Sequence, residues 1–322
     1  MKRVLVVGGA GYIGAHVSWV LQNSGYKVRI LDDFSNGLKR RVDGIFDDVV
    51  VGDVLDRESI INALSEIDSV IHLAAKKAVG ESVTNPLKYY QHNVGGTLNL
   101  LAAMSLKGVK KLVFSSTAAV YSPSQKDSIA EEDATEPLSP YGATKLLSEN
   151  LIREVSKAEE MSSVSLRYFN VVGSSKPEFG DNSKDNLVPK VFAAIARGES
   201  PEIYGDDYQT PDGTCIRDYI HVEDIAEAHL SALKAVERGQ IAKVYNVGSG
   251  SGYSVLEMIK QISRTIGTEL NPKVVGRRDR DTPRLIASTR KIESELGWKP
   301  KSSLEEMIDS AWAAERKYGI GV

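Results

Sequence analysis

Short apolar runs alternate with amphipathic stretches over the first two thirds of the chain. The apolar runs have the length of buried strands, and they lie at residues 4–7, 27–31, 49–51, 69–73, 111–115 and 163–167. The segments between them have helical periodicity. Since a crossover helix is the normal link between parallel strands, this alternation predicts an α/β fold with a doubly wound parallel sheet.

The pattern changes after Asn170. A polar stretch with glycine and proline occupies residues 173–186, and a helix is expected near 188–197. Residues 220–237 and 242–246 again have the patterns of a helix and a strand of the main sheet. We therefore predict a first domain over residues 1–170, joined by segments returning at about 220–246, and a smaller, discontinuous mixed α/β lobe within residues 171–322.

Composition and charge narrow the function classes. The 322 residues carry a formal net charge of −3, so no basic field is available to hold a phosphate backbone, and nucleic acid is not expected as a partner. The single cysteine, Cys215, cannot pair within the chain, and close-set Cys and His ligands are missing from the sequence. Neither a disulfide framework nor a metal site is predicted, and Cys215 is expected to be a small buried residue.

The N-terminal segment resembles a strand more than a targeting signal. Residues 1–7 contain two basic residues and a short apolar run that glycines interrupt. No apolar run approaches the roughly 20 residues that a membrane span needs. We expect a cytoplasmic location and no membrane partner.

Three glycines directly follow the first predicted strand and open a helix: Gly8, Gly11 and Gly14. Such a turn brings the backbone close to a pyrophosphate, and the helix N-terminus then faces the phosphates. Asp32 ends the second strand, where a carboxylate can accept hydrogen bonds from ribose hydroxyls and repel a 2′-phosphate. The arrangement predicts a Rossmann site for NAD in preference to NADP; the alternative is a glycine-rich turn without a ligand.

A candidate catalytic pair lies farther along the chain. Tyr141 and Lys145 are four residues apart and share a helix face. A free tyrosine has a pKa near 10, and a lysine charge, with a positive nicotinamide nearby, would lower that pKa towards neutrality. Such a pair also occurs by chance on exposed helices, but the glycine turn and the hydroxyls of residues 115–117 at a strand end favour redox chemistry on an alcohol.

These motifs resemble the short-chain dehydrogenase/reductase family. The glycine spacing and the Tyr141/Lys145 pair agree with that family, and the segments 73–82, 167–170 and 205–222 resemble its extended branch, most closely the UDP-glucose 4-epimerases. The resemblance covers nearly the whole chain. It implies NAD-dependent interconversion of UDP-galactose and UDP-glucose, by oxidation at sugar C4 and re-reduction on the opposite face.

The resemblance also implies roles for individual residues. The catalytic group would be Thr117, Tyr141 and Lys145. The cofactor-binding residues would be Gly8, Gly11, Tyr12, Ile13, Gly14, Asp32, Asp33, Asn36, Gly37, Asp53, Val54, Leu73, Ala74, Ala75, Lys77, Asn93, Thr117, Tyr141, Lys145 and Phe169. The UDP-sugar residues would be Lys77, Thr117, Tyr141, Asn170, Asn186, Leu187, Tyr204, Arg217, Arg278, Asp281 and Leu285. Guanidinium groups suit the diphosphate, although on composition alone the arginines near 277–280 could equally form a solvated loop.

Several alternatives remain open from sequence. Ala118 and Ala119 stand where the related dehydratases have an acidic pair, which disfavours dehydration. A 4-epimerase of UDP-N-acetylhexosamine or UDP-uronic acid remains an alternative, as does a silent NAD-binding regulator, although such proteins typically lose the tyrosine or the lysine. Leu285 occupies a position that limits room around the sugar, and leucine there is expected to leave space for an N-acetyl group. The effect of Arg280, where near relatives have glycine, is open.

By analogy with its relatives, the chain is expected to form a homodimer. The interface would use the helix carrying Tyr141 and the helix near residues 97–106.

Overall fold

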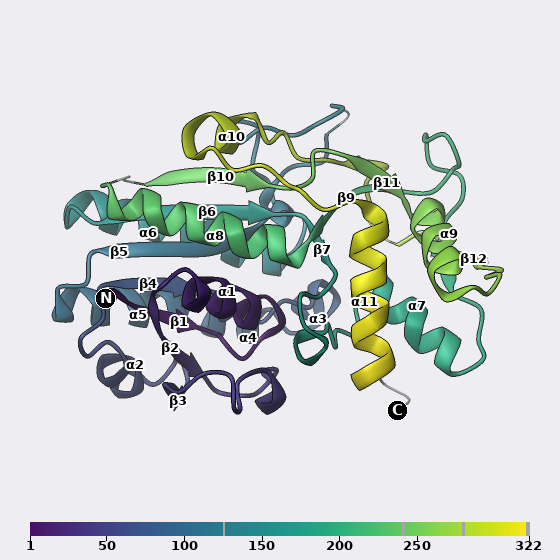
Figure 1. Ribbon diagram of the computed structural model, residues 1–322. Coiled ribbons are helices and arrows are strands. Elements are labelled where there is room, and N and C mark those ends of the chain that lie inside the picture. Colours follow the sequence, from purple (N-terminus) through teal and green to yellow (C-terminus); the bar gives the residue numbers. More distant parts are fainter. Residues whose placement is uncertain (125, 240–241, 279–280, 320–322) are drawn as a thin grey trace.

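A seven-stranded parallel sheet forms the centre of the molecule (Figure 1). The computed structural model describes residues 1–124, 126–239, 242–278 and 281–319. The strand order is β10-β6-β5-β4-β1-β2-β3. The strands are β1 (Arg3–Val7), β2 (Lys27–Asp32), β3 (Val49–Val51), β4 (Ser69–His72), β5 (Lys111–Thr117), β6 (Ser162–Tyr168) and β10 (Lys243–Val247). The predicted doubly wound α/β sheet is confirmed.

Helices cover both faces of this sheet. Successive side chains of β1 from Val4 to Val7 point to opposite faces and all are apolar, so each face needs a covering layer. Val4 and Val6 pack in one apolar layer with α1 (Tyr12–Asn23) and α8 (Val222–Glu237). Leu5 and Val7 pack in the opposite layer with residues from the second set of helices, which are α2 (Arg57–Ala63), α5 (Gly96–Lys107) and α6 (Pro140–Ala158). Short helices α3 (Val79–Thr84), α4 (Pro86–Tyr89) and the π-helix η2 (Tyr90–Gly95) lead into α5, and 3-10 turns lie at η1 (Lys39–Arg41), η3 (Ala118–Val120) and η4 (Pro177–Phe179).

A smaller mixed lobe lies beside the sheet in Figure 1, on the side of α7, α9 and α11. Its larger sheet has the order β11-β9-β13, with β7 also paired to β9, and its smaller sheet pairs β12 with β8. A separate apolar cluster unites α7, α9 and α11. The elements are β7 (Asn170–Val172), α7 (Leu187–Ala196), β8 (Glu202–Tyr204), β9 (Ile216–His221), β11 (Gly252–Ser254), α9 (Val255–Ile266), β12 (Lys273–Val275), β13 (Arg284–Leu285) and α11 (Leu304–Tyr318). Helix α10 (Arg290–Leu296) packs instead on β10 and α8 of the main sheet.

The junction between β9 and α8 differs from the expected helix over residues 220–237. Ile220 and His221 complete β9, and the helix begins at Val222. The His221 ring accepts a hydrogen bond from the Glu223 backbone N–H (3.1 Å) and so caps the helix. After α8, β10 returns to the main sheet and pairs with β6.

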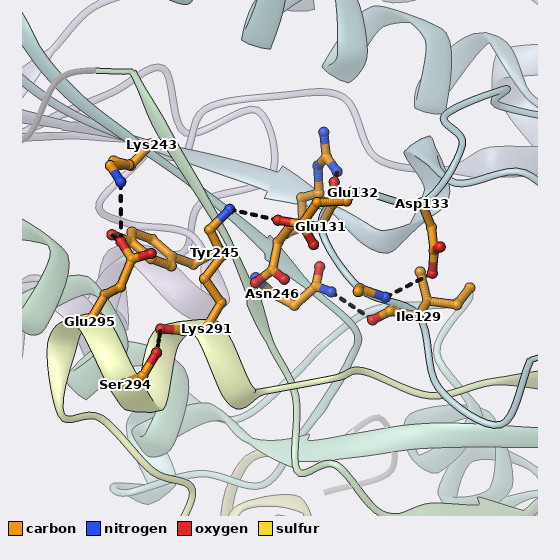
Figure 2. Close-up of polar contacts among 12 residues, drawn as sticks. Ile129, Glu131, Glu132, Asp133, Lys243, Tyr245, Asn246, Lys291, Ser294 and Glu295 are labelled. Carbon is orange, nitrogen blue, oxygen red and sulfur yellow. Dashed lines mark hydrogen bonds and ion pairs between the residues drawn. The ribbon is translucent and has the colours of Figure 1, made fainter.

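Hydrogen bonds join the connection between β5 and α6 to β10 (Figure 2). Others join it to the segment that carries Leu285. A carboxylate oxygen of Glu131 accepts from the Asn246 N–H (2.7 Å), and the Asn246 amide donates to the Ile129 carbonyl (2.8 Å). The backbone of Ile129 also bonds to residues 286 and 288, directly after Leu285. This network joins a loop of the first half of the chain to the wall of the second lobe.

Candidate active site

The glycine turn is packed too tightly for side chains at two of its positions. A Cβ at Gly14 would lie 2.1 Å from the carbonyl oxygen of Gly8, and a Cβ at Gly8 would lie 2.6 Å from the nitrogen of Ala74. Gly8 also has a φ of +86°. Gly11 is the N-cap of α1, so the free N–H groups of that helix begin directly after the turn. The close approach of helix and strand that a pyrophosphate site needs is thus present.

A cavity of about 120 Å³ lies at the ends of β1, β2 and β4. It is lined by eleven of the predicted cofactor residues: Gly8, Gly11, Asp32, Asp33, Asn36, Gly37, Asp53, Val54, Leu73, Ala74 and Ala75. Sequence reasoning missed Ser35, Lys76 and His92, which also line it, and the Lys76 ammonium donates to the Ser35 hydroxyl (2.9 Å). Ser35 and Lys76 are chain neighbours of predicted residues, and that adjacency was the available signal.

Asp32 has structural partners of its own. One carboxylate oxygen accepts from the Ala10 N–H (2.9 Å) and the other from the Phe34 N–H (2.8 Å). Burial raises the pKa of this carboxyl, while the two backbone hydrogen bonds lower it. Asp32 therefore ties the glycine turn to the end of β2 while it lines the smaller cavity, and its bond to a ribose stays a prediction.

A second cavity, of about 840 Å³, lies between the sheet and the smaller lobe. All the predicted UDP-sugar residues line it: Lys77, Thr117, Tyr141, Asn170, Asn186, Leu187, Tyr204, Arg217, Arg278, Asp281 and Leu285. Tyr12, Ile13 and Phe169, predicted to contact the cofactor, line it as well. The structure thus brings residues from both halves of the chain around one space of a size typical of ligand sites.

The hydroxyls of Thr117 and Tyr141 meet at the start of α6. Thr117 ends β5, and Ser139 caps α6 by accepting from the Gly142 N–H (3.2 Å). A Cβ at Gly142 would lie 2.2 Å from the carbonyl oxygen of Ala119, so this glycine lets the helix begin against the end of β5. Burial raises the pKa of Tyr141, and a hydrogen bond with Thr117 lowers it. The helix start therefore places the predicted base beside its predicted hydroxyl partner.

Lys145 lies one helical turn deeper, with 3% of its surface exposed. Its ammonium donates to the carbonyl of Ser115 (2.7 Å) and lies 4.7 Å from the centroid of the Phe114 ring. Burial lowers its pKa to about 7, and the Glu149 carboxylate opposes that shift. In the protein alone the Tyr141 pKa is raised, against the expected lowering, because desolvation of the phenolate is the largest effect on it. The hydrogen bond with Thr117 does not outweigh this desolvation.

Asn93, Gly14 and Lys145, all predicted to bind the cofactor, line neither cavity. The Asn93 side chain is buried, accepts from the Lys76 N–H (2.8 Å) and donates to the Lys76 carbonyl (3.0 Å) and the Thr144 hydroxyl (2.9 Å). Its contribution in this structure is to fix the backbone beside Lys77. Gly14 contributes the close packing already described.

The far wall of the larger cavity is polar. Arg217 and Asp281 form an ion pair, and the Arg278 guanidinium lies 4.0 Å from the centroid of the Tyr204 ring. Asn186, the N-cap of α7, donates to the Asp181 carboxylate (2.6 Å). Arg280 falls outside the described residues.

Neither a candidate membrane span nor a candidate metal cluster is found in the part of the chain that the structure describes. No helix in it is both long and apolar enough to cross a membrane. No group of three or more His, Cys, Asp or Glu side chains in it could hold a metal ion. Cys215 is buried and lines the larger cavity.

Comparisons with known proteins agree with this geometry. Residues 4–248 match the model of the NAD dependent epimerase/dehydratase family. The UDP-glucose 4-epimerase of Bacillus subtilis is 42% identical, over 96% of this chain and 95% of that protein. The bifunctional UDP-glucose 4-epimerase and UDP-xylose 4-epimerase 1 of Pisum sativum is 40% identical, over 97% and 95%.

Solved structures give the same result. A crystal structure of a UDP-glucose 4-epimerase superposes with a TM-score of 0.95 at 36% identity and covers 100% of this chain and 99% of its own. The UDP-glucose 4-epimerase of Bifidobacterium longum in complex with NAD+ and UDP superposes with a TM-score of 0.92 at 39% identity and covers 100% of both chains. The resemblance found in the sequence is confirmed. This chain belongs to the NAD-dependent epimerase/dehydratase family, and within it to the isomerases of the UDP-glucose 4-epimerase type.

Proposed function

We propose that this chain interconverts UDP-galactose and UDP-glucose through a transient ketone at sugar C4. The observation that carries this conclusion is the larger cavity, because the Thr117 and Tyr141 hydroxyls line it together with the Arg217/Asp281 pair. A base beside a redox cofactor can then act on a sugar whose diphosphate the guanidinium groups hold.

The residues present fit NAD. The glycine turn, the smaller cavity and the two carboxylates Asp32 and Asp33 supply the pyrophosphate and ribose contacts, and carboxylates there disfavour a 2′-phosphate. We propose that residues 1–170, with α8 and β10, bind the cofactor, and that the rest of residues 171–322 binds the UDP-sugar. A bound NAD would supply the hydride chemistry at C4, by which the sugar is oxidised and then reduced on its opposite face.

Side chains of the protein carry out the proton transfer at the sugar 4-hydroxyl. Tyr141 is proposed to take the proton of the 4-hydroxyl and later return it, while Thr117 hydrogen-bonds the reacting oxygen. Lys145 supplies positive charge beneath them and is proposed to hold the nicotinamide ribose. Ala118 and Ala119 present methyl groups to the same cavity, so the segment after Thr117 supplies no acid for eliminating water.

The test is incubation of purified protein with UDP-galactose without added NAD, with UDP-glucose followed by nucleotide-sugar chromatography and heat-released NAD measured per chain. Conversion together with bound NAD is expected. If UDP-galactose is not converted even when NAD is supplied, this substrate pair is refuted. The same test would then be made with the UDP-N-acetylhexosamines.

Leu285 is proposed to set the breadth of sugar acceptance. It lines the larger cavity and packs with Phe169 and Tyr121. Leu285→Tyr is expected to lower kcat/KM for UDP-N-acetylglucosamine by about tenfold or more, because overpacking costs about 1–3 kcal/mol, while UDP-glucose turnover changes less. Coupled assays on both substrates, with Leu285→Met as the volume-matched control, measure this. Equal inactivity of wild type and Leu285→Ala on the N-acetylated sugar would count against it.

We also propose a cytoplasmic homodimer. Exposed apolar side chains gather on the helices over one side of the sheet: Val83, Leu87, Leu98, Leu106 and Leu147. Leu98 and Leu147, on α5 and α6, are 54% and 45% exposed, and burial against a second copy would remove them from water. The double variant Leu98→Glu/Leu147→Glu is expected to sediment as a monomer. Val274→Glu, exposed in the other lobe, should sediment like wild type, and a dimeric double variant would exclude this interface.

A further inference from the structure

Glu149 completes a row of three functional groups on one face of α6. Tyr141, Lys145 and Glu149 are spaced by four residues, so each lies one turn below the last. Glu149 is 6% exposed, although a carboxylate is rarely buried without a specific reason. No step of the proposed reaction uses it.

Two neighbouring residues of β5 fix the two lower groups of this row. The Ser115 carbonyl accepts from Lys145, and the Ser116 hydroxyl donates to a carboxylate oxygen of Glu149. The end of β5 thereby sets the depth of both charges relative to Thr117, which follows on the same strand. A rotation or slip of α6 would break both bonds together.

Arg167 of β6 holds the carboxylate from another side. Its Nε and Nη2 donate to the two oxygens of Glu149 (3.0 and 2.7 Å), and its guanidinium lies 4.9 Å from the centroid of the Tyr121 ring. Such a bidentate, charge-assisted contact fixes orientation as well as position. Both side chains are less than a tenth exposed, so this ion pair lies in a region of low dielectric.

The surroundings of Lys145 contain little else that favours its charge. His72 of β4 lies close, and burial lowers its pKa to about 3; His229 of α8, which pairs with the Ser115 hydroxyl, has its pKa lowered by burial to about 4. Tyr141 on its own helix, and Tyr168 and Arg167 of β6, complete the titratable and charged groups there. Among the groups that the structure describes, Glu149 is the carboxylate that opposes the desolvation of Lys145.

We propose that Glu149 is a positioning residue of the epimerase, which keeps Lys145 protonated and directed at the Tyr141 site during turnover. The proposal rests on the roles assigned above to Tyr141 and Lys145. Without the carboxylate, the buried amine and the positive nicotinamide together would favour loss of the Lys145 proton near neutral pH. The ammonium charge that stabilises the Tyr141 phenolate would then be lost.

The variant Glu149→Gln tests this, because it removes the charge while the amide oxygen can still accept from the Ser116 hydroxyl and from Arg167 Nε. The bond from Arg167 Nη2 to the second oxygen is lost with the charge. Its kcat is expected to fall on the alkaline side of the pH profile, with the alkaline limb moved to lower pH by about 1 unit, as removing a nearby opposite charge lowers a lysine pKa. KM for UDP-galactose and the bound NAD should change less than about twofold. A purely structural role would instead lower stability and leave the shape of the pH profile unchanged.

A second variant covers the case in which Glu149→Gln leaves Arg167 unpaired and the protein unstable. Glu149→Gln/Arg167→Met removes both members of the pair, which proteins often tolerate, and it should show the same direction of pH shift. Asp48→Asn, which breaks the distant Arg29–Asp48 pair, is the matched control and should keep the wild-type profile. Wild-type turnover with an unmoved profile in both Glu149 variants overturns this inference alone, whereas a wild type inactive on UDP-galactose overturns the proposed function with it.

Discussion

Tyr141→Phe is expected to lower kcat for UDP-galactose by about 10²–10⁴-fold, the usual contribution of a positioned acid–base group. The variant removes one oxygen from the wall of the larger cavity and leaves the glycine turn and the smaller cavity untouched. NAD content and KM should therefore stay close to wild type. The initial rate of UDP-glucose formation, together with heat-released NAD per chain, measures both effects.

Tyr26→Phe is the control for loss of a tyrosine hydroxyl. Tyr26 bonds to Glu237 on α8 (3.3 Å) and lines neither cavity. It should retain full activity. A Tyr141→Phe enzyme that kept more than about a tenth of wild-type kcat would exclude Tyr141 as the base.

The second large effect is expected at the glycine turn. In Gly14→Ala the new methyl group would lie 2.1 Å from the Gly8 oxygen and 2.8 Å from the Gly9 Cα. Both neighbours are backbone, so the turn itself must shift, at a cost on the order of 1–3 kcal/mol. Purified Gly14→Ala should lose at least about nine tenths of its bound NAD, and calorimetry should show a lower Tm.

Gly95→Ala is the matched control. Its Cβ would meet only the Leu55 side chain, at 3.9 Å, and its backbone is helical. This variant should retain NAD and match or exceed wild-type stability. Full NAD occupancy in Gly14→Ala would show that the turn does not hold the cofactor as proposed.

The main sheet could be predicted from sequence because its strands are nearly continuous apolar runs buried on both faces, as at Val4 to Val7. The strand pairing of the smaller lobe could not. Its strands β8, β12 and β13 have two or three residues each, and β9 pairs with β7, β11 and β13, whose positions along the chain are far apart. Pairings of that kind depend on tertiary packing, which local patterns do not contain.

The candidate site, too, has a part that sequence could predict and a part that it could not. The glycine spacing and the Tyr141/Lys145 pair are local signals, and the structure places Gly8, Gly11 and Tyr141 on the walls of the two cavities. Gly14 and Lys145 lie behind those walls. The partnership of Glu149 with Arg167 joins a helix to a strand, and nothing in either segment alone indicates it. The direction of the Tyr141 pKa was also beyond sequence, since burial decides it.

β10 comes late in the sequence but belongs to the main sheet, and this affects how the protein can fold while it is being synthesised. β6 is an inner strand only because residues 243–247 return to pair with it. The face of the sheet that α1 covers in part is fully covered only when α8 has packed onto it. A ribosome makes both elements long after β6. Until then the nascent chain has a free strand edge and a partly bare apolar face, which are the features that promote aggregation. The cofactor half of this enzyme therefore cannot complete its folding before β7, α7, β8 and β9 of the smaller lobe have been translated.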